Sequence, residues 1–148
     1  MGEAKLTIEE LIAAARGEVL VALSEEAEAA VNKAREVVEK CVSEDKVVYG
    51  LTTGFGKFSD VTISEEDTLA LQENLIMSHA CGVGEPLPDE VVRAMMLLRV
   101  NALSVGFSGI RVSTIKTLIE MLNKGVIPVV PSKGSLGASG DLVPLAHM

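Results

Sequence analysis

The sequence predicts an all-α protein, mainly helical with little or no strand. Three observations support this prediction. Apolar residues recur at helical spacing in several separate segments, most of these segments begin at residues that cap helices, and only residues 126–131 read as extended. The elements can therefore be placed by their caps and their apolar stripes.

The first two helices follow from side chains that accept hydrogen bonds from free backbone N–H groups. Thr7 and Glu10 have the spacing of a capping box, which places the start of a short helix at Ile8. Ser24 is expected to cap a second helix that runs to about Cys41. The apolar stripe of that helix consists of Ala27, Val31, Ala34, Val38 and Cys41.

Three more helices and one extended segment complete the prediction. Ser64 is expected to cap a third helix ending near His79, and a fourth should run from Pro88-Asp89 to about Ser104. A fifth, over residues 113–124, should stop at Gly125. The prolines at 128 and 131 restrict the extended segment that follows to a sheet edge or a connection.

The composition excludes several classes of function. A net charge of −8 and a pI near 4.8 argue against nucleic acid or an anionic membrane as a partner. The polar first residues do not form a secretory signal, which favours the cytoplasm. Cys41 and Cys81 make neither a disulfide framework nor a metal cluster, so we expect two buried thiols and no metal. The aliphatic content of the chain indicates that it packs against partners.

The stretch from Gly134 to Asp141 is the best candidate for chemistry, because its small residues let the backbone approach itself closely. If the loop were bent tightly, the Gly140 nitrogen could bond to the Ala138 carbonyl carbon and close a five-membered ring. Loss of two waters, one of them carrying the Ser139 hydroxyl, would leave an exocyclic methylidene group. An ordinary flexible connector before a helix is the alternative interpretation of this composition.

Three segments in order resemble the N-terminal part of the aromatic amino acid lyases. These are Val48 to Gly56, with the sequence VYGLTTGFG, Asn74 to Gly82, with the sequence NLIMSHACG, and Gly134 to Met148. The resemblance extends from about Leu6 to the last residue. It implies the fumarase-aspartase-like fold of these enzymes and an ammonia-lyase activity.

The resemblance also implies a prosthetic group and catalytic residues. A 4-methylidene-imidazol-5-one would form autocatalytically from Ala138, Ser139 and Gly140, with Asp141 assisting cyclisation. Asp141 also has a simpler role as the residue that begins a helix, where its charge is favoured. Tyr49 would be the acid/base residue at the substrate, although a tyrosine can equally be a packed structural residue.

The pair Ser78-His79 would lie beside the substrate ring, and in this it resembles the histidine-specific members of the family. An imidazole can hydrogen-bond a polar ring, whereas a plain phenyl ring would leave it unpaired. Histidine, converted to urocanate, is therefore the first expected substrate, and tyrosine the second. The sequence leaves open whether the reaction is that of a lyase or an aminomutase.

Members of this family are much longer than 148 residues and associate as homotetramers. We therefore expect a single N-terminal piece, residues 1–148, that is inactive alone and acts on a small amino acid within a homo-oligomer or with a missing C-terminal portion. A second hypothesis is a non-catalytic helical module that assembles through its apolar faces. Turnover of histidine by the purified chain would exclude that module.

Overall fold

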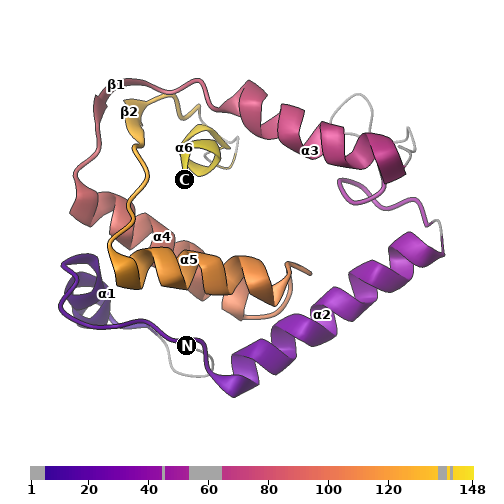
Figure 1. The fold of residues 1–148 in the computed structure, drawn as a ribbon, viewed down its shortest axis with the longest axis horizontal. Coiled ribbons are helices and arrows are strands. Elements are labelled where there is room, and N and C mark those ends of the chain that lie inside the picture. The colour runs from indigo at the N-terminus through magenta and orange to yellow at the C-terminus, as the bar shows by residue number, and fades with distance from the viewer. Residues whose placement is uncertain (1–5, 45, 54–64, 137–139, 141) are drawn as a thin grey trace.

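The computed structural model describes residues 6–44, 46–53, 65–136, 140 and 142–148, with the backbone alone for residues 65–69. Helices make up most of these residues, which confirms the predicted fold class (Figure 1). The elements in order are α1 (Ile8–Ala15), α2 (Glu25–Ser43), α3 (Glu65–His79), β1 (Val83–Pro86), α4 (Asp89–Ser104), α5 (Val112–Lys124), β2 (Pro131–Lys133) and α6 (Leu142–His147).

The predicted helix ends are confirmed where they lie in described residues. Thr7 and Glu10 form the reciprocal capping box, and the Glu10 carboxylate accepts the Thr7 backbone N–H at 2.8 Å. Hydrogen bonds from Thr7 lower the pKa of Glu10. The Ser24 hydroxyl accepts the Ala27 N–H, and Gly125 ends α5 in the left-handed conformation. The predicted cap Ser64 lies outside the described residues.

The core forms around α4, which contacts α1, α2 and α5 (Figure 1). Its fully buried side chains interlock with apolar residues of the neighbouring helices, and burial of each contributes about 1.5–3 kcal/mol. The largest fully buried side chains of the whole core, from α4 and from the elements around it, are Met96, Leu97, Ile115, Leu122, Val31, Val92, Val100 and Val130. The core therefore holds α1, α2, α4 and α5 together independently of α3 and α6.

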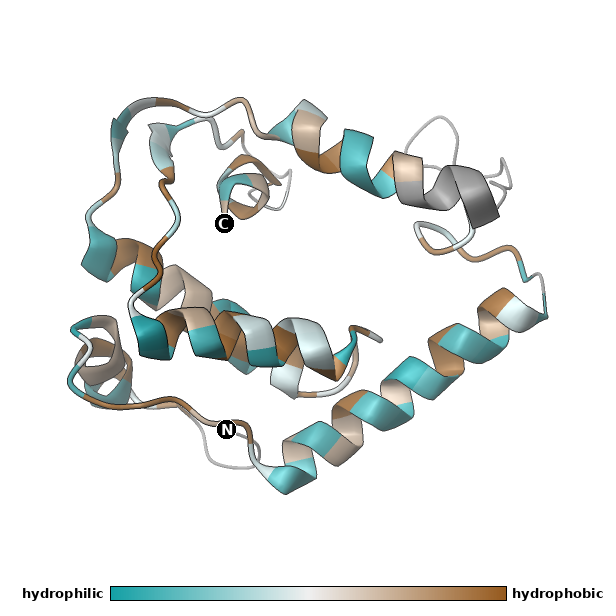
Figure 2. Cartoon of the chain, in the orientation of Figure 1, coloured by the Kyte–Doolittle hydropathy of each residue, from teal (hydrophilic) through white to brown (hydrophobic). Residues whose placement is uncertain are grey.

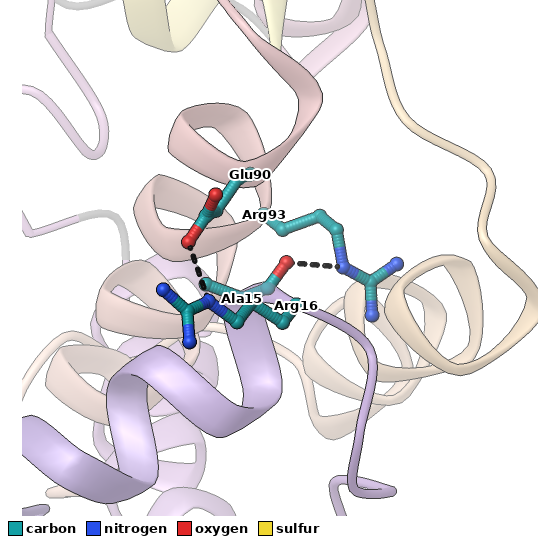
Figure 3. Close-up of polar contacts among 4 residues, drawn as sticks. All are labelled: Ala15, Arg16, Glu90 and Arg93. Atoms are coloured by element: carbon teal, nitrogen blue, oxygen red, sulfur yellow. Dashed lines mark hydrogen bonds and ion pairs between the residues drawn. The ribbon is translucent and has the colours of Figure 1, made fainter.

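Arg93 of α4 connects the ends of two other helices. Its guanidinium donates hydrogen bonds to the carbonyl oxygens of Ala14 and Ala15, at 3.2 and 3.0 Å, and of Leu122, at 3.1 Å. These carbonyls lie in the last turns of α1 and α5, and those of Ala14 and Leu122 also accept the backbone N–H groups of Gly17 and Gly125. Figure 3 shows the bond to Ala15. The planar fork of arginine is suited to holding several acceptors at once.

A second arginine contact lies beside the first but contributes less. Arg16 and Glu90 form an ion pair at 3.2 Å (Figure 3), with both side chains more than half exposed to solvent. Exposed ion pairs contribute between about 0 and 1 kcal/mol because water and salt screen them. Arg93 is therefore the stronger link between α4 and the neighbouring helices.

The extended region differs from the prediction. Strand β2 begins only at Pro131 and pairs antiparallel with β1, a strand that the sequence analysis did not predict. The pair is short and both strands are edges, which explains how each accommodates a proline. The loop that follows β2 leads to α6, which contacts α3. Strands and helix thus form a second group of elements beside the helical core (Figure 1).

Two further features are the exposure of the cysteines and the polarity of the helices. The expectation of two buried thiols is wrong, because Cys41 is only half-buried and Cys81 is exposed where α3 gives way to β1. Within the described residues, no helix is long and apolar enough to cross a membrane. Figure 2 shows polar and apolar residues interspersed along α2, while α6 is mostly apolar.

The Arg93 contacts give a test of the core. We expect Arg93→Lys to lower the free energy of unfolding by about 2 kcal/mol, because the single nitrogen of lysine cannot reach all three carbonyls that the three separate nitrogens of Arg93 contact. Urea unfolding followed by circular dichroism measures this change. Arg99→Lys, at an exposed position of the same helix, is the matched control and should change the value by less than about 0.5 kcal/mol. Equal effects of both substitutions would contradict the assigned role.

Candidate active site

The loop predicted to carry the chemistry lies between β2 and α6. Ala138, Ser139 and Asp141 lie outside the described residues, so their arrangement stays a prediction. Gly140 is described and has a φ of 76°, the left-handed region that glycine adopts without strain. A methyl group added there would meet nothing within 4 Å. Gly140 therefore has a backbone conformation that favours glycine, with open space around it among the described residues.

Tyr49 lies in a compact turn between α2 and α3. Two threonines close this turn: Thr52 accepts the Val48 N–H at 2.9 Å, and Thr53 accepts the Gly50 N–H at 3.2 Å. The Tyr49 side chain is 63% exposed. The phenol is therefore accessible to solvent. The glycines at 54 and 56 of the same motif lie outside the described residues.

His79 ends α3 with its ring held by the preceding turn. Its Nδ1 lies 2.8 Å from the Leu75 carbonyl oxygen, and the Ser78 hydroxyl lies 3.0 Å from the same nitrogen. Because a carbonyl oxygen can only accept, Nδ1 must carry the proton. In a neutral ring, Nε2 is then a hydrogen-bond acceptor, and it has no hydrogen-bond partner among the described residues.

Tyr49 and His79 line the same cavity, which has a volume of about 370 Å³. Its other walls come from Leu75 and Ile76 of α3 and from the apolar face of α6. The α6 residues are Leu142, Leu145 and Ala146. A cavity of this size and character, apolar with two polar groups, is typical of a site for a small molecule. Three segments far apart in the sequence therefore meet at one pocket.

The structure adds residues that the sequence analysis did not single out. The Leu75 carbonyl sets the His79 tautomer, and α6 supplies a wall of the cavity. The helical spacing of Leu142, Leu145 and Ala146 was the available signal for that wall. Ser78 is exposed and contacts the ring of His79.

In the described part of the chain, no group of three or more His, Cys, Asp and Glu residues could hold a metal ion.

Comparison with known proteins gives a consistent result. A family model for the aromatic amino acid lyases matches residues 6–148. The chain is 66% identical over 143 residues to a histidine ammonia-lyase of Caldanaerobacter subterraneus subsp. tengcongensis, covering 97% of this chain and 28% of that protein. The chain therefore spans little more than a quarter of the length of this relative.

Solved structures agree with the sequence comparisons. A histidine ammonia-lyase from Trypanosoma cruzi superimposes with a TM-score of 0.85 at 40% identity, over 96% of this chain and 27% of that chain. A phenylalanine aminomutase from Pantoea agglomerans superimposes with a TM-score of 0.90 at 39% identity, over 99% of this chain and 28% of that chain. Both similarities extend over almost the whole chain.

The His79 geometry predicts a particular proton position. The chain has two histidines, so the nitrogen signals of both rings can be resolved by NMR of a sample labelled with ¹⁵N. We expect the neutral His79 ring to carry its proton on Nδ1, and Ser78→Ala to leave it there because the Leu75 carbonyl remains. A neutral ring protonated on Nε2 would contradict the assignment.

Proposed function

The chain belongs to the aromatic amino acid lyase family, and we propose that it is the N-terminal part of a histidine ammonia-lyase. The reaction is the non-oxidative elimination of ammonia from L-histidine to give urocanate. It breaks one carbon–nitrogen and one carbon–hydrogen bond. The site therefore needs an electrophile, a group that accepts the proton from the substrate carbon and a group that binds the substrate ring. Identity of 66% to a protein of that name supports the proposal.

The observation that carries the proposal is the shared cavity. Tyr49, His79 and the wall of α6 surround about 370 Å³, and α6 directly follows the segment of Ala138, Ser139 and Gly140. An electrophile formed in that segment would lie at the start of this wall. One pocket therefore contains the binding group and the proton-transfer group that the reaction needs, next to the source of the electrophile.

His79 supports histidine as the substrate. With Nδ1–H donating to the Leu75 carbonyl, Nε2 is left to accept a hydrogen bond from a ligand. The imidazole N–H of histidine can donate this bond, and so can the phenol of tyrosine, but a phenyl ring cannot. Leaving a desolvated acceptor unpaired costs about 1–3 kcal/mol, which disfavours phenylalanine. Ser78 contributes by contacting the same ring nitrogen.

Tyr49 is the proposed acid/base residue. Its hydroxyl oxygen accepts the proton that leaves the substrate carbon. This role requires that the oxygen can reach a substrate in the cavity. The phenol lines that cavity and is 63% exposed, so a ligand can reach it. Proton transfer by a positioned side chain contributes typically about 10²–10⁴-fold to a rate.

The residues present fit a methylidene-imidazolone prosthetic group. Ala138 supplies the carbonyl carbon, Gly140 the nitrogen and Ser139 the hydroxyl that is lost, and the left-handed Gly140 allows the chain to turn sharply there. When formed, the group supplies an electrophile that no coded side chain offers. Asp141 is proposed to assist the cyclisation, and no metal is needed.

The activity is proposed for the assembled protein and not for these 148 residues alone. The chain spans 28% of its relative, and the family resemblance implies a homotetramer, so the remaining polypeptide and neighbouring subunits would complete the site. Exposed apolar side chains near the cavity, such as Ile76 at 56% and Met77 at 66%, agree with a surface that packs against more protein. We place the protein in the cytoplasm.

A chimera tests the function. In it, residues 6–148 of this chain replace the 143 matching residues of the Caldanaerobacter relative. We expect the chimera to convert L-histidine to urocanate, followed by the absorbance of the product. Tyr49→Phe should lower kcat/KM at least about a hundredfold, because it removes the proton-transfer group and little volume.

The alternatives are separate outcomes of the same assay. Preference for tyrosine over histidine would contradict the substrate assignment, and a β-amino acid product would indicate an aminomutase. A folded chimera without turnover of any aromatic amino acid would overturn the enzymatic proposal and favour the helical assembly module. Full activity of Tyr49→Phe would remove Tyr49 from the mechanism.

A further inference from the structure

The two ends of the loop over residues 134–141 meet the same short segment, which begins at Gly82. The incoming end is β2, which pairs with β1 immediately after Gly82. The outgoing end is α6, whose His147 reaches back to Gly82 itself. The loop is thus closed at its base by contacts among residues distant in the sequence.

The incoming end packs too closely for any larger residue. A methyl group on Gly134 would lie 2.6 Å from Val143 Cγ1 of α6 and 3.2 Å from the Gly82 Cα. The φ of Gly134 is 143°, a conformation in which side chains are strained. Gly134 therefore lets β2, α6 and Gly82 come into direct contact at the base of the loop.

The outgoing end is fixed by one polar contact. The Gly82 backbone N–H donates a hydrogen bond of 3.0 Å to Nε2 of His147, and both groups are partly buried. A methyl group on Gly82 would lie 2.9 Å from that nitrogen and 3.1 Å from the Pro131 side chain. Gly82 is therefore enclosed between α6 and the first residue of β2.

A simpler role for His147 is that of a cation favoured at the C-terminus of a helix. The geometry contradicts this role, because a nitrogen that accepts an N–H cannot itself be protonated. His147 is also absent from the residues that line the cavity with Tyr49 and His79. Its contact is with the segment that anchors the loop.

We propose that His147 is a positioning residue for ring formation: by accepting the Gly82 N–H, it holds α6 against β1 and β2 and keeps the loop closed enough for cyclisation. The inference rests on the proposed function, because it concerns the prosthetic group formed from Ala138, Ser139 and Gly140. Strained backbone persists only where its surroundings fix it. Without the contact, α6 can move away from the strands, and the reacting atoms spend less time together.

The test follows ring formation directly and needs no substrate. The chimera is made by cell-free synthesis, and trypsin then cuts after Lys133 to release the peptide that begins at Gly134. The ring lowers the mass of this peptide by two waters. His147→Leu should slow the appearance of the lighter peptide about tenfold, since it leaves the Gly82 N–H without its acceptor. His147→Gln keeps an acceptor at a similar reach and should restore most of the rate.

His79→Leu is the matched control, because it removes the other histidine of the chain. We expect its ring to form at the unsubstituted rate while turnover of histidine falls. Hydrogen exchange of the Gly82 amide, measured by NMR on the 148-residue chain, provides a second readout. It should accelerate in His147→Leu but not in His79→Leu, while core amides such as Val100 keep their protection.

The outcomes separate this inference from the proposed function. An unsubstituted chimera that never loses two waters would overturn the proposed function and, with it, any role of His147 in cyclisation. A ring that forms equally fast in His147→Leu and the unsubstituted chimera would overturn the inference alone. So would His147→Gln forming its ring as slowly as His147→Leu, because the acceptor would then be irrelevant.

Discussion

The hydrogen bond between the Gly82 N–H and His147 is the directional contact that we propose to govern the arrangement of the candidate site. It joins the segment just after His79 to the helix just after the loop of Ala138 to Gly140. Without it, α3 and α6 would be related mainly by apolar contacts, which are not directional. This directional hydrogen bond therefore acts together with the close approach of Gly134 to Gly82 and the β1–β2 pair to link the segment after His79 to both ends of the loop.

The helical core serves a different purpose. Arg93 and the buried side chains around α4 hold α1 and α5 together, and no residue of this group lines the cavity with Tyr49. The Leu87 N–H donates to the carbonyl of Val130, a core residue, at 2.8 Å and thereby connects the strand pair to that core. The proposed binding and catalytic side chains thus lie on turns and helix ends that a rigid scaffold positions.

Local signals in the sequence were sufficient to predict most helices. The Thr7 and Ser24 caps and the Gly125 stop act within one turn of chain, so their residues are readable without tertiary structure. Strand β1 was missed because Val83-Gly84-Glu85-Pro86 shows no alternation and its side chains are exposed. Its pairing comes entirely from β2, about fifty residues later in the sequence.

The candidate site was predictable in its parts but not in its assembly. The motifs around Tyr49, His79 and Ala138 were recognisable as a family resemblance, whereas the tautomer of His79 depends on a carbonyl and has no sequence signature. His147 escaped notice for a related reason. Its partner is a backbone N–H 65 positions away, and any residue type supplies one.

The most direct test of the account is the intact mass of the chimera compared with that of its Ser139→Ala variant, which lacks the hydroxyl that must leave. We predict that the unsubstituted protein is lighter than its sequence by two water molecules and that the variant retains them. An unsubstituted protein at its full sequence mass would contradict the account, because the loop closed by Gly82, Gly134 and His147 would then not form the electrophile.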